Sequence, residues 1–162
     1  MELYFLRHGK ADELALGERD SQRKLSPEGE ADIQRLAKHL KSMGFAPGAI
    51  ISSPLARASQ TTRIIAKELG LTGLHSEDER LAHGCGFGEL QQIVEPYTHQ
   101  KRILIVGHQP DMGRFALRLC GEFNISVPPG TLFRIDAETV DPGTGVLKWL
   151  IQPTALNKEE LQ

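Results

Sequence analysis

Three short segments of the chain carry histidine and arginine at places where these residues could act together. Arg7-His8-Gly9 directly follows the apolar run Leu3-Tyr4-Phe5-Leu6, Arg57 lies near the start of an expected helix, and His108 follows another apolar run. Guanidinium groups bind phosphate oxygens through paired hydrogen bonds, and a neutral imidazole can attack phosphorus. Neighbouring arginines lower the pKa of such an imidazole and keep it neutral near pH 7. These residue types describe a phosphate site with a histidine nucleophile.

Two further features favour an anion at this site. Arg57 occupies the first turn of its helix, where the helix dipole attracts negative charge. A cation there is unfavourable for the helix alone, unless an anion binds between the guanidinium and the helix N-terminus. Gly9 has no Cβ and would let a substrate or another backbone segment approach closely. Arg23 could extend the pocket toward substrate, or could pair with Asp20 or Glu28. Gly9 and Arg23 are therefore candidate substrate-binding residues.

The elements that must position these residues follow from the apolar pattern. Short apolar runs predict three buried strands, at 3–6, 48–52 and 102–107. Helical spacing with capping residues predicts four helices, near 26–44, 58–70, 90–97 and 112–121. Alternation and turn residues predict a hairpin from 131–136 to 146–151, whereas residues 72–86 lack a regular pattern. We expect the polar tail to be frayed from about residue 153.

Strands that alternate with helices over residues 1–120 predict an α/β fold, a three-layer sandwich with a mostly parallel central sheet and helices on both faces. Ligands of such sheets bind outside the carboxyl ends of the strands. This rule brings His8, Arg57 and His108 to one crevice. The length and the absence of an internal repeat or linker predict a single domain over residues 1–162.

Three ordered motifs resemble those of the histidine phosphatase superfamily, the phosphoglycerate mutase-like proteins. They are Leu6-Arg7-His8-Gly9-Lys10-Ala11, Ser52-Ser53-Pro54-Leu55-Ala56-Arg57-Ala58-Ser59-Gln60-Thr61 and Val106-Gly107-His108-Gln109-Pro110. The segment with Asp20, Arg23, Leu25, Ser26 and Gly29 resembles the small SixA-type phosphohistidine phosphatases, and the chain length agrees with that branch. Three motifs in order at strand ends form a far more specific signal than one triplet.

The resemblance implies a role for each matched residue. His8 would be the nucleophile and would become phosphohistidine, while Arg7, Arg57 and His108 would hold the phosphoryl oxygens and stabilise the transition state. Water would then hydrolyse the phosphoenzyme, and no metal or other cofactor would be needed because the arginines supply positive charge.

Larger members of the family use a carboxylic acid to protonate the leaving group, and the candidates here are Asp78 and Glu79. Neither lies in a motif that aligns firmly. An imidazole leaving group needs less help from an acid than an alcohol does, so the expected substrate is a phosphohistidine on a protein, such as a phosphotransfer domain. Only 31 residues separate Gly70 from Arg102, which leaves no room for a large lid insertion.

Other functions remain open from the sequence. A phosphatase of a small phosphorylated metabolite and a non-catalytic module that binds a phosphorylated ligand are alternatives. A metal-dependent hydrolase built on His8, His83 and His108 is a third, and a mutase is the least favoured because little lid is available. His83 and Cys85 lie in a glycine-rich loop that we expect to be flexible and close to the pocket.

Composition narrows the range of partners. The chain has 162 residues and a formal net charge of −2, so it gives no general electrostatic case for binding nucleic acid or acidic membranes. No apolar run approaches the ~20 residues that span a bilayer, and the first residues lack the pattern of a signal peptide. Two cysteines are too few for a disulfide scaffold, so we expect a reduced, cytoplasmic protein.

Overall fold

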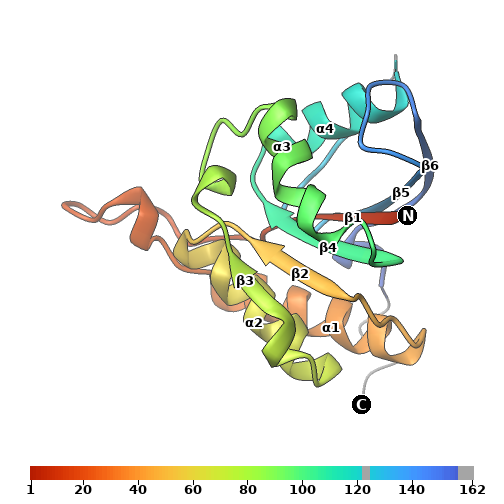
Figure 1. The fold of residues 1–162 in the computed structure, drawn as a ribbon. Helices are drawn as coiled ribbons and strands as arrows, with labels where there is room; N and C mark the ends of the chain where they lie inside the picture. Colours follow the sequence, from red (N-terminus) through yellow and green to blue (C-terminus); the bar gives the residue numbers. More distant parts are fainter. Residues whose placement is uncertain (122–124, 157–162) are drawn as a thin grey trace.

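The computed structural model describes residues 1–121 and 125–156, in which a six-stranded sheet lies between two pairs of α-helices (Figure 1). The strands are β1 (Glu2–Arg7), β2 (Ala49–Ser52), β3 (His75–Glu77), β4 (Arg102–Gly107), β5 (Leu132–Ala137) and β6 (Gly145–Ile151). The α-helices are α1 (Pro27–Ser42), α2 (Ala56–Leu69), α3 (Phe87–Val94) and α4 (Asp111–Cys120). Five short 3-10 segments join them: η1 (Asp20–Gln22), η2 (Thr72–Leu74), η3 (Glu79–Leu81), η4 (Glu95–Tyr97) and η5 (Pro153–Ala155).

The sheet is mostly parallel, as the sequence predicts. Its strand order is β3-β2-β4-β1-β5-β6, in which the first four strands are parallel and β5 and β6 form an antiparallel hairpin at one side. In the pairing of β1 with β4, Arg7 lies opposite Gly107, and the N–H of His8 donates to the carbonyl of Gly107 at 3.0 Å. His8 and His108 therefore leave the sheet side by side.

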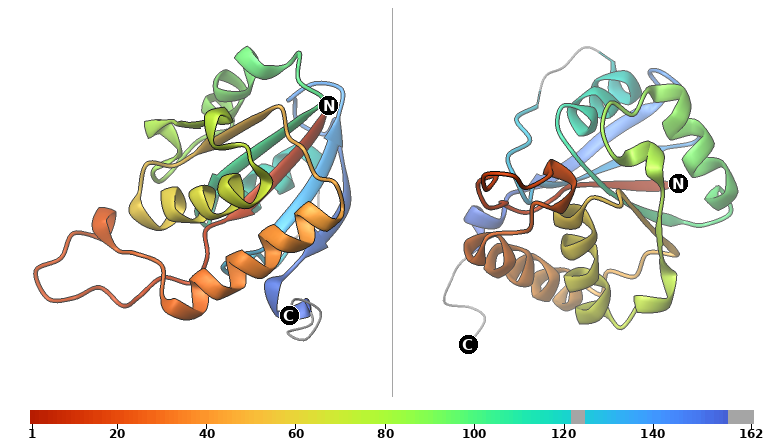
Figure 2. Two further views of the ribbon diagram at one scale, coloured as in Figure 1. Left: turned by 90° about the horizontal axis from the view of Figure 1, so that it is seen from below. Right: turned by 90° about the vertical axis from the view of Figure 1, so that its left-hand side faces the viewer.

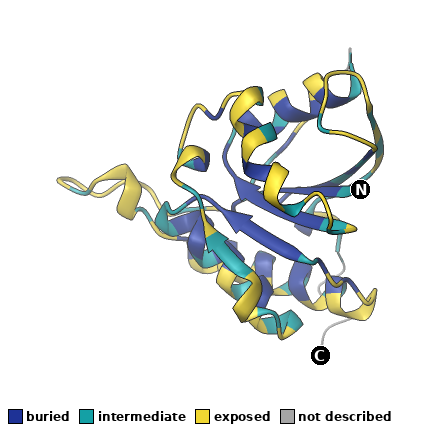
Figure 3. Cartoon of the chain, in the orientation of Figure 1, coloured by how far each residue is buried: buried dark blue, intermediate teal, exposed yellow. Residues whose placement is uncertain are grey.

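Side-chain alternation along the strands divides the interior into two cores, one on each face of the sheet. Leu3, Phe5 and Ile105 point to the face covered by α3 and α4, where they pack with Leu90 and Phe115. On the other face, α1 and α2 lie beside each other against the strands and pack on residues Tyr4, Leu6, Ile50, Leu104 and Val106 (Figure 2). The strands are buried throughout their centres, whereas the loop that precedes α1 is mostly exposed (Figure 3). This is the expected three-layer sandwich.

The start of α1 holds the segment after β1 in place. Ser26 caps the helix by accepting a hydrogen bond from the N–H of Gly29 at 3.0 Å. A Cβ on Gly29 would lie 2.0 Å from the carbonyl oxygen of Lys10, so only glycine allows this close approach. Because Lys10 follows His8 and Gly9, helix α1 sets the path of the backbone that carries the predicted nucleophile.

Two segments differ from the sequence expectations. Residues 72–86 contain the short strand β3, which pairs in parallel with β2, and two 3-10 turns. The tail does not fray at residue 153, because Pro153–Ala155 form a 3-10 helix in which Pro153 is buried, and this turn contacts α1. The rest of the expected frayed tail, residues 157–162, lies outside the described residues. Within the described ranges, no helix combines the length and the apolar character that a membrane span requires.

Candidate active site

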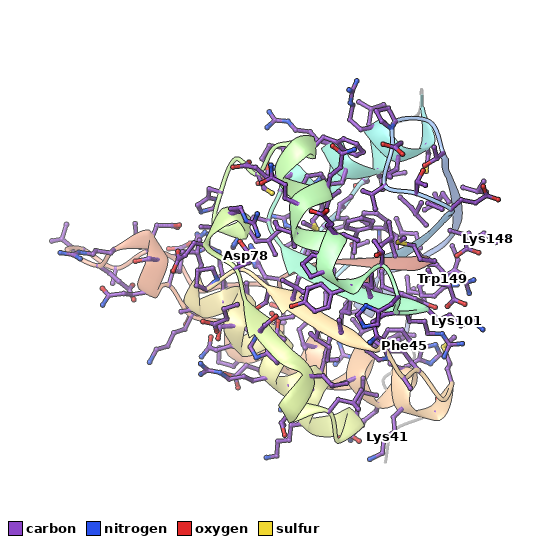
Figure 4. All side chains as sticks on the ribbon, in the orientation of Figure 1. Lys41, Phe45, Asp78, Lys101, Lys148 and Trp149 are labelled. Carbon is purple, nitrogen blue, oxygen red and sulfur yellow. The ribbon has the colours of Figure 1, made fainter. Side chains whose placement is uncertain are left out.

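The carboxyl ends of β1, β2 and β4 share one edge of the sheet because these strands are parallel. His8 follows β1, Ser53 and Arg57 follow β2, and His108 follows β4. In Figure 4, Asp78 lies at this end of the sheet, whereas Lys101, which precedes β4, lies at the opposite end. The sequence motifs thus meet at a single place.

His8 is held in one tautomer by its own neighbourhood. Its side chain is buried, and Nδ1 lies 2.7 Å from the carbonyl oxygen of Gly9. A carbonyl only accepts, so Nδ1 carries the proton and Nε2 carries the free electron pair. Burial lowers the pKa of His8 to about 3, and the positive charges of Arg57, Arg7 and Arg23 act in the same direction. The imidazole is therefore neutral at pH 7 and presents Nε2 as a nucleophile.

The buried guanidinium of Arg57 contacts two histidines of the crevice, His8 and His83. Arg57 is 1% exposed, and its Nε donates to His8 Nε2 at 3.3 Å. Nη1 and Nη2 donate to the carbonyl and carboxylate oxygens of Asp20 at 2.9 and 3.0 Å, and Nη2 also lies 3.1 Å from His83 Nε2. The Asp20 carboxylate thus supplies the hydrogen-bond acceptor that the buried Arg57 guanidinium needs. A phosphoryl group could take its place, because guanidinium groups bind carboxylate and phosphate oxygens in the same way.

His108 lies beside His8, with ring centroids 5.0 Å apart. Its Nε2 is 2.8 Å from Ser53 Oγ, and burial lowers the pKa of His108 to about 2. The Nδ1 atom is buried and has no hydrogen-bond partner among the described residues. An unpartnered buried polar atom at the edge of a crevice is available for a ligand.

The remaining predicted arginines also reach this edge. Arg7 donates from Nη1 to the carbonyl of Val127 at 2.9 Å, which leaves its buried Nε without a partner within the described chain. Arg23 pairs with Asp20 at 3.3 Å, one of the two partners that the sequence left open, and its charge reaches His8. Both arginines thus contribute to the positive potential around the nucleophile.

Gly9 lies against another backbone segment, one of the two close neighbours that the sequence left open for it. Its N–H donates to Thr61 Oγ1 at 3.0 Å, and a Cβ there would lie 2.8 Å from Ile33 and 3.2 Å from the carbonyl oxygen of Gly29. The close neighbour is therefore helix α1. Gly9 also positions the proposed nucleophile, because its carbonyl oxygen fixes His8 Nδ1.

The structure also corrects the candidate acids. The carboxylate of Asp78 accepts hydrogen bonds from Arg80 Nε and Nη2 at 2.9 and 2.6 Å, and these bonds lower the pKa of Asp78. An ionised carboxylate cannot give a proton. Glu79 lies in η3 and is exposed to solvent. Neither residue has the environment of a proton donor.

Two residues that sequence reasoning did not assign to the phosphate site, Asp20 and His83, lie at its mouth. The Asp20 carboxylate contacts Arg57, Arg23 and His83, the last at 3.3 Å. Burial works to raise the pKa of Asp20, but the hydrogen bond with His83 and the charges of Arg57 and Arg23 lower it overall. The His83 ring lies 4.6 Å from that of His108. The SixA-like segment around Asp20 and the expected closeness of the His83 loop to the pocket were the sequence signals that pointed here.

The loop that carries His83 is fixed, contrary to the expected flexibility. The buried carboxylate oxygen Oδ2 of Asp111 accepts from the N–H groups of Gly84 and Cys85 at 2.9 and 3.2 Å. Gly86 then starts helix α3, and the Cys85 side chain is buried in the core below. Burial raises the pKa of the Cys85 thiol to about 12. The glycine-rich segment is therefore a tethered turn.

The metal alternative gains no support from side-chain placement. Within residues 1–121 and 125–156, no three His, Cys, Asp or Glu side chains are grouped so that they could hold a metal ion. Three histidines converge at this edge, but their ring nitrogens face arginine, serine and carboxylate groups.

Comparison with known proteins gives the family. The model of the histidine phosphatase superfamily (branch 1) matches residues 3–103, which include Arg7, His8 and Arg57. The chain belongs to this superfamily. A curated relative, an uncharacterised protein of Picosynechococcus sp., is 37% identical over 120 residues, which is 72% of this chain and 71% of the relative. Membership of the histidine phosphatase superfamily supports phosphatase chemistry at the crevice.

The fold of the chain is similar to that of solved SixA-type structures. The protein histidine phosphatase SixA, complexed with tungstate, has a TM-score of 0.87 at 24% identity and covers 97% of this chain and 100% of its own. A candidate SixA from Agrobacterium tumefaciens has a TM-score of 0.81 at 25% identity, with coverage of 94% and 97%. A mutant phosphoserine phosphatase from Entamoeba histolytica has a TM-score of 0.70 at 16% identity, with coverage of 96% and 99%. Phosphatases that are named for different substrates thus share this fold.

Proposed function

We propose that this chain is a phosphatase in which His8 Nε2 takes the phosphoryl group and forms a transient phosphohistidine. The observation that carries the proposal is the tautomer of His8, because the Gly9 carbonyl holds the ring proton at Nδ1. The electron pair of Nε2 is then unprotonated and accepts a hydrogen bond from Arg57 Nε at 3.3 Å, which an incoming phosphoryl group would replace. A histidine that merely bound phosphate would serve better as a donor, with a proton at that nitrogen.

Arg57, Arg7 and His108 would hold the transferred group. Arg57 Nε contacts His8 Nε2, and the buried Nε of Arg7 and Nδ1 of His108 have no hydrogen-bond partner among the described residues. Donors fixed before the reaction stabilise the charge that spreads over the phosphoryl oxygens in the transition state. Water then attacks phosphorus, the P–N bond breaks, and its electron pair returns to His8 Nε2.

The substrate that fits best is a phosphohistidine displayed on another protein, such as a phosphotransfer domain. The elements between β3 and β4 pack on a face of the sheet, where α3 joins the core with α4, and so they do not form a lid. A groove of about 510 Å³ lies beside the mouth, between residues 21–24 and the start of α2, and includes Lys24, Arg63 and Glu77. An open mouth with a polar groove suits a protein surface better than a small metabolite, which remains the second candidate.

The test is phosphate release from a phosphohistidine-bearing protein in the presence of EDTA, followed by ³¹P NMR. We expect wild type to release phosphate and His8→Asn to release none, and His99→Gln to behave as wild type. His99 is the matched control, because it is an exposed histidine just before β4, at the opposite edge of the sheet. Wild type should also carry an acid-labile, alkali-stable phosphoryl label that His8→Asn lacks.

The other outcomes separate the alternatives. Release from small phosphate esters at a kcat/KM equal to that on the phosphoprotein would favour the metabolite phosphatase. Loss of activity in EDTA, with recovery on adding a divalent metal, would favour the metal-dependent hydrolase. Tight binding of the phosphoprotein with no release by wild type would favour the binding module.

A further inference from the structure

His83 lies on the side of the site where the leaving group of the substrate is expected. In a phosphoryl transfer the attacking and leaving atoms lie roughly in line on opposite sides of phosphorus. His8 is only 7% exposed, so it would attack phosphorus from the buried side of the site. The leaving atom would then face the open mouth. The His83 side chain is 53% exposed and stands at that mouth, within 4.6 Å of His108 between ring centroids.

His83 Nε2 has a hydrogen-bond partner in each of its protonation states. Without a proton, Nε2 accepts from Arg57 Nη2 at 3.1 Å. With a proton, Nε2 donates to Asp20 Oδ2 at 3.3 Å. A nitrogen that is satisfied in both states can give up and regain a proton without leaving a polar group unpaired.

The fold also holds this imidazole in place. Asp111 opens helix α4, three residues after His108, and its buried carboxylate binds the N–H groups of Gly84 and Cys85 directly after His83. The loop that carries His83 and the helix that follows His108 are therefore joined by one side chain. Such backbone anchoring is what a positioned proton donor requires.

We propose that His83 is the proton donor to the leaving group of the phosphatase reaction, with Asp20 as its counterion; this inference rests on the proposed function of His8. The candidates that the sequence favoured do not compete, since the Asp78 carboxylate is bound by Arg80 and Glu79 is exposed in η3. The groups that face the His83 ring are Asp20 from η1, Arg57 from α2 and the neutral His108 after β4.

The proton and electron balance is complete in two steps. In the first, His8 Nε2 bonds to phosphorus, and the bond from phosphorus to the leaving atom breaks. That atom is a ring nitrogen in a phosphohistidine and an oxygen in an ester, and it takes its proton from the His83 imidazolium. In the second, water bonds to phosphorus, its proton goes to His83 Nε2, and the P–N bond pair returns to His8. The sum is hydrolysis of the substrate to phosphate and a free histidine or alcohol, with His8 and His83 restored.

The test compares leaving groups. A proton donor matters for a poor leaving group and little for a good one, and kcat/KM reports only the steps up to formation of the phosphoenzyme, before water reacts. His83→Gln should therefore lower kcat/KM on phenyl phosphate by roughly 10²-fold, the usual range for general acid catalysis. On p-nitrophenyl phosphate the same variant should retain kcat/KM within about threefold. His99→Gln, remote and exposed, should leave both rates unchanged.

Each result decides the question. An unequal loss, greater for phenyl phosphate, supports the proton-donor role, because a merely structural defect would lower both rates alike. An equal loss on both substrates, or no loss on either, overturns it. His8→Asn is measured in parallel: if that variant remains active, or if wild type hydrolyses no substrate, the proposed function itself fails, and this inference fails with it.

Discussion

Burial divides the three histidines of the site into two kinds. His8 and His108 are 7% and 1% exposed, and loss of solvation lowers their pKa values to about 3 and about 2. Both are therefore neutral near pH 7, so His8 can attack phosphorus and His108 keeps one ring N–H as a hydrogen-bond donor. His83 is exposed and lies next to a carboxylate, and so differs from both.

The buried histidines should make stability depend on pH. In the unfolded chain each takes up a proton near pH 6.5, whereas in the folded protein each stays neutral down to about pH 3 or below. The unfolded state therefore binds more protons between these values, and the free energy of unfolding falls as pH drops below 6.5, by about 1.4 kcal/mol per pH unit for each histidine. Urea unfolding of wild type between pH 6.5 and 4.5 measures this slope.

Removing one of these histidines should reduce the slope. His8→Asn should lose stability less steeply than wild type over the same range, and His99→Gln should follow wild type because His99 is exposed. Identical slopes for wild type and His8→Asn would contradict the neutral, buried state of His8.

Asp20 should weaken the binding of free phosphate. Its carboxylate already holds Arg57 at 3.0 Å, so an incoming phosphoryl oxygen must displace it or share the guanidinium. Since the Asp20 side chain is 46% exposed, this ion pair is worth only ~1 kcal/mol. Asp20→Asn should lower the inhibition constant of inorganic phosphate by about fivefold, while Asp12→Asn, an exposed change in the same loop, should not. Weaker inhibition by phosphate in Asp20→Asn would show that the carboxylate assists anion binding.

The sequence predicts His8, Arg57 and His108 because each follows a recognisable strand or opens a helix. It does not predict the contacts of His83, because the loop that holds this residue follows no periodic pattern. Its place depends on Asp111, 28 positions along the chain, and on Asp20, which lies in another loop. Long-range contacts between loops leave no local pattern to detect.

At the scale of elements, helix α1 and the segment after β1 fit together through a glycine. Gly29→Ala should destabilise the protein, although alanine favours helices, because the new Cβ would meet the backbone of Lys10. We expect a loss of about 1–3 kcal/mol in the free energy of unfolding, together with a fall in kcat as the path around His8 shifts. Thermal and urea unfolding measure the first effect.

Gly88 provides the matched control. It lies in α3, and nothing stands within 4 Å of a Cβ built there. Gly88→Ala should therefore gain up to about 1 kcal/mol from helix propensity alone. If the two substitutions changed stability in the same direction, the close contact between Gly29 and Lys10 would not be the cause.

Strand β3 was not predicted from the sequence, because its residues lack an apolar pattern. His75-Ser76-Glu77 has no apolar run, and β3 pairs only with β2 at the edge of the sheet. Its residues are not held by a buried face, although His75 Nε2 lies 2.8 Å from Ser52 Oγ on β2. The inner strands β1, β2 and β4 were predictable because both of their faces are buried and their sequences are continuously apolar.

In the molecule as a whole, the site stays open because the four α-helices of the described residues pack on the two faces of the sheet. The groove beside the mouth should then matter for a protein substrate and not for a small one. Arg63→Glu, on the exposed side of α2, should raise KM for a phosphohistidine protein several-fold and leave KM for p-nitrophenyl phosphate unchanged. Lys67→Glu, one turn further along α2 and outside this groove, is the control. Equal effects of the two substitutions would point to general charge and not to docking.

The tethered turn below the mouth has a consequence for oxidative conditions. The thiol of Cys85 is buried, and with a pKa of about 12 it carries almost no thiolate at neutral pH. The proposed nucleophile is a nitrogen, which peroxide does not convert to an inactive acid as it does a reactive thiolate. Treatment with peroxide or iodoacetamide should therefore leave the phosphatase activity unchanged. Dephosphorylation would continue under conditions that inactivate phosphatases with a catalytic cysteine.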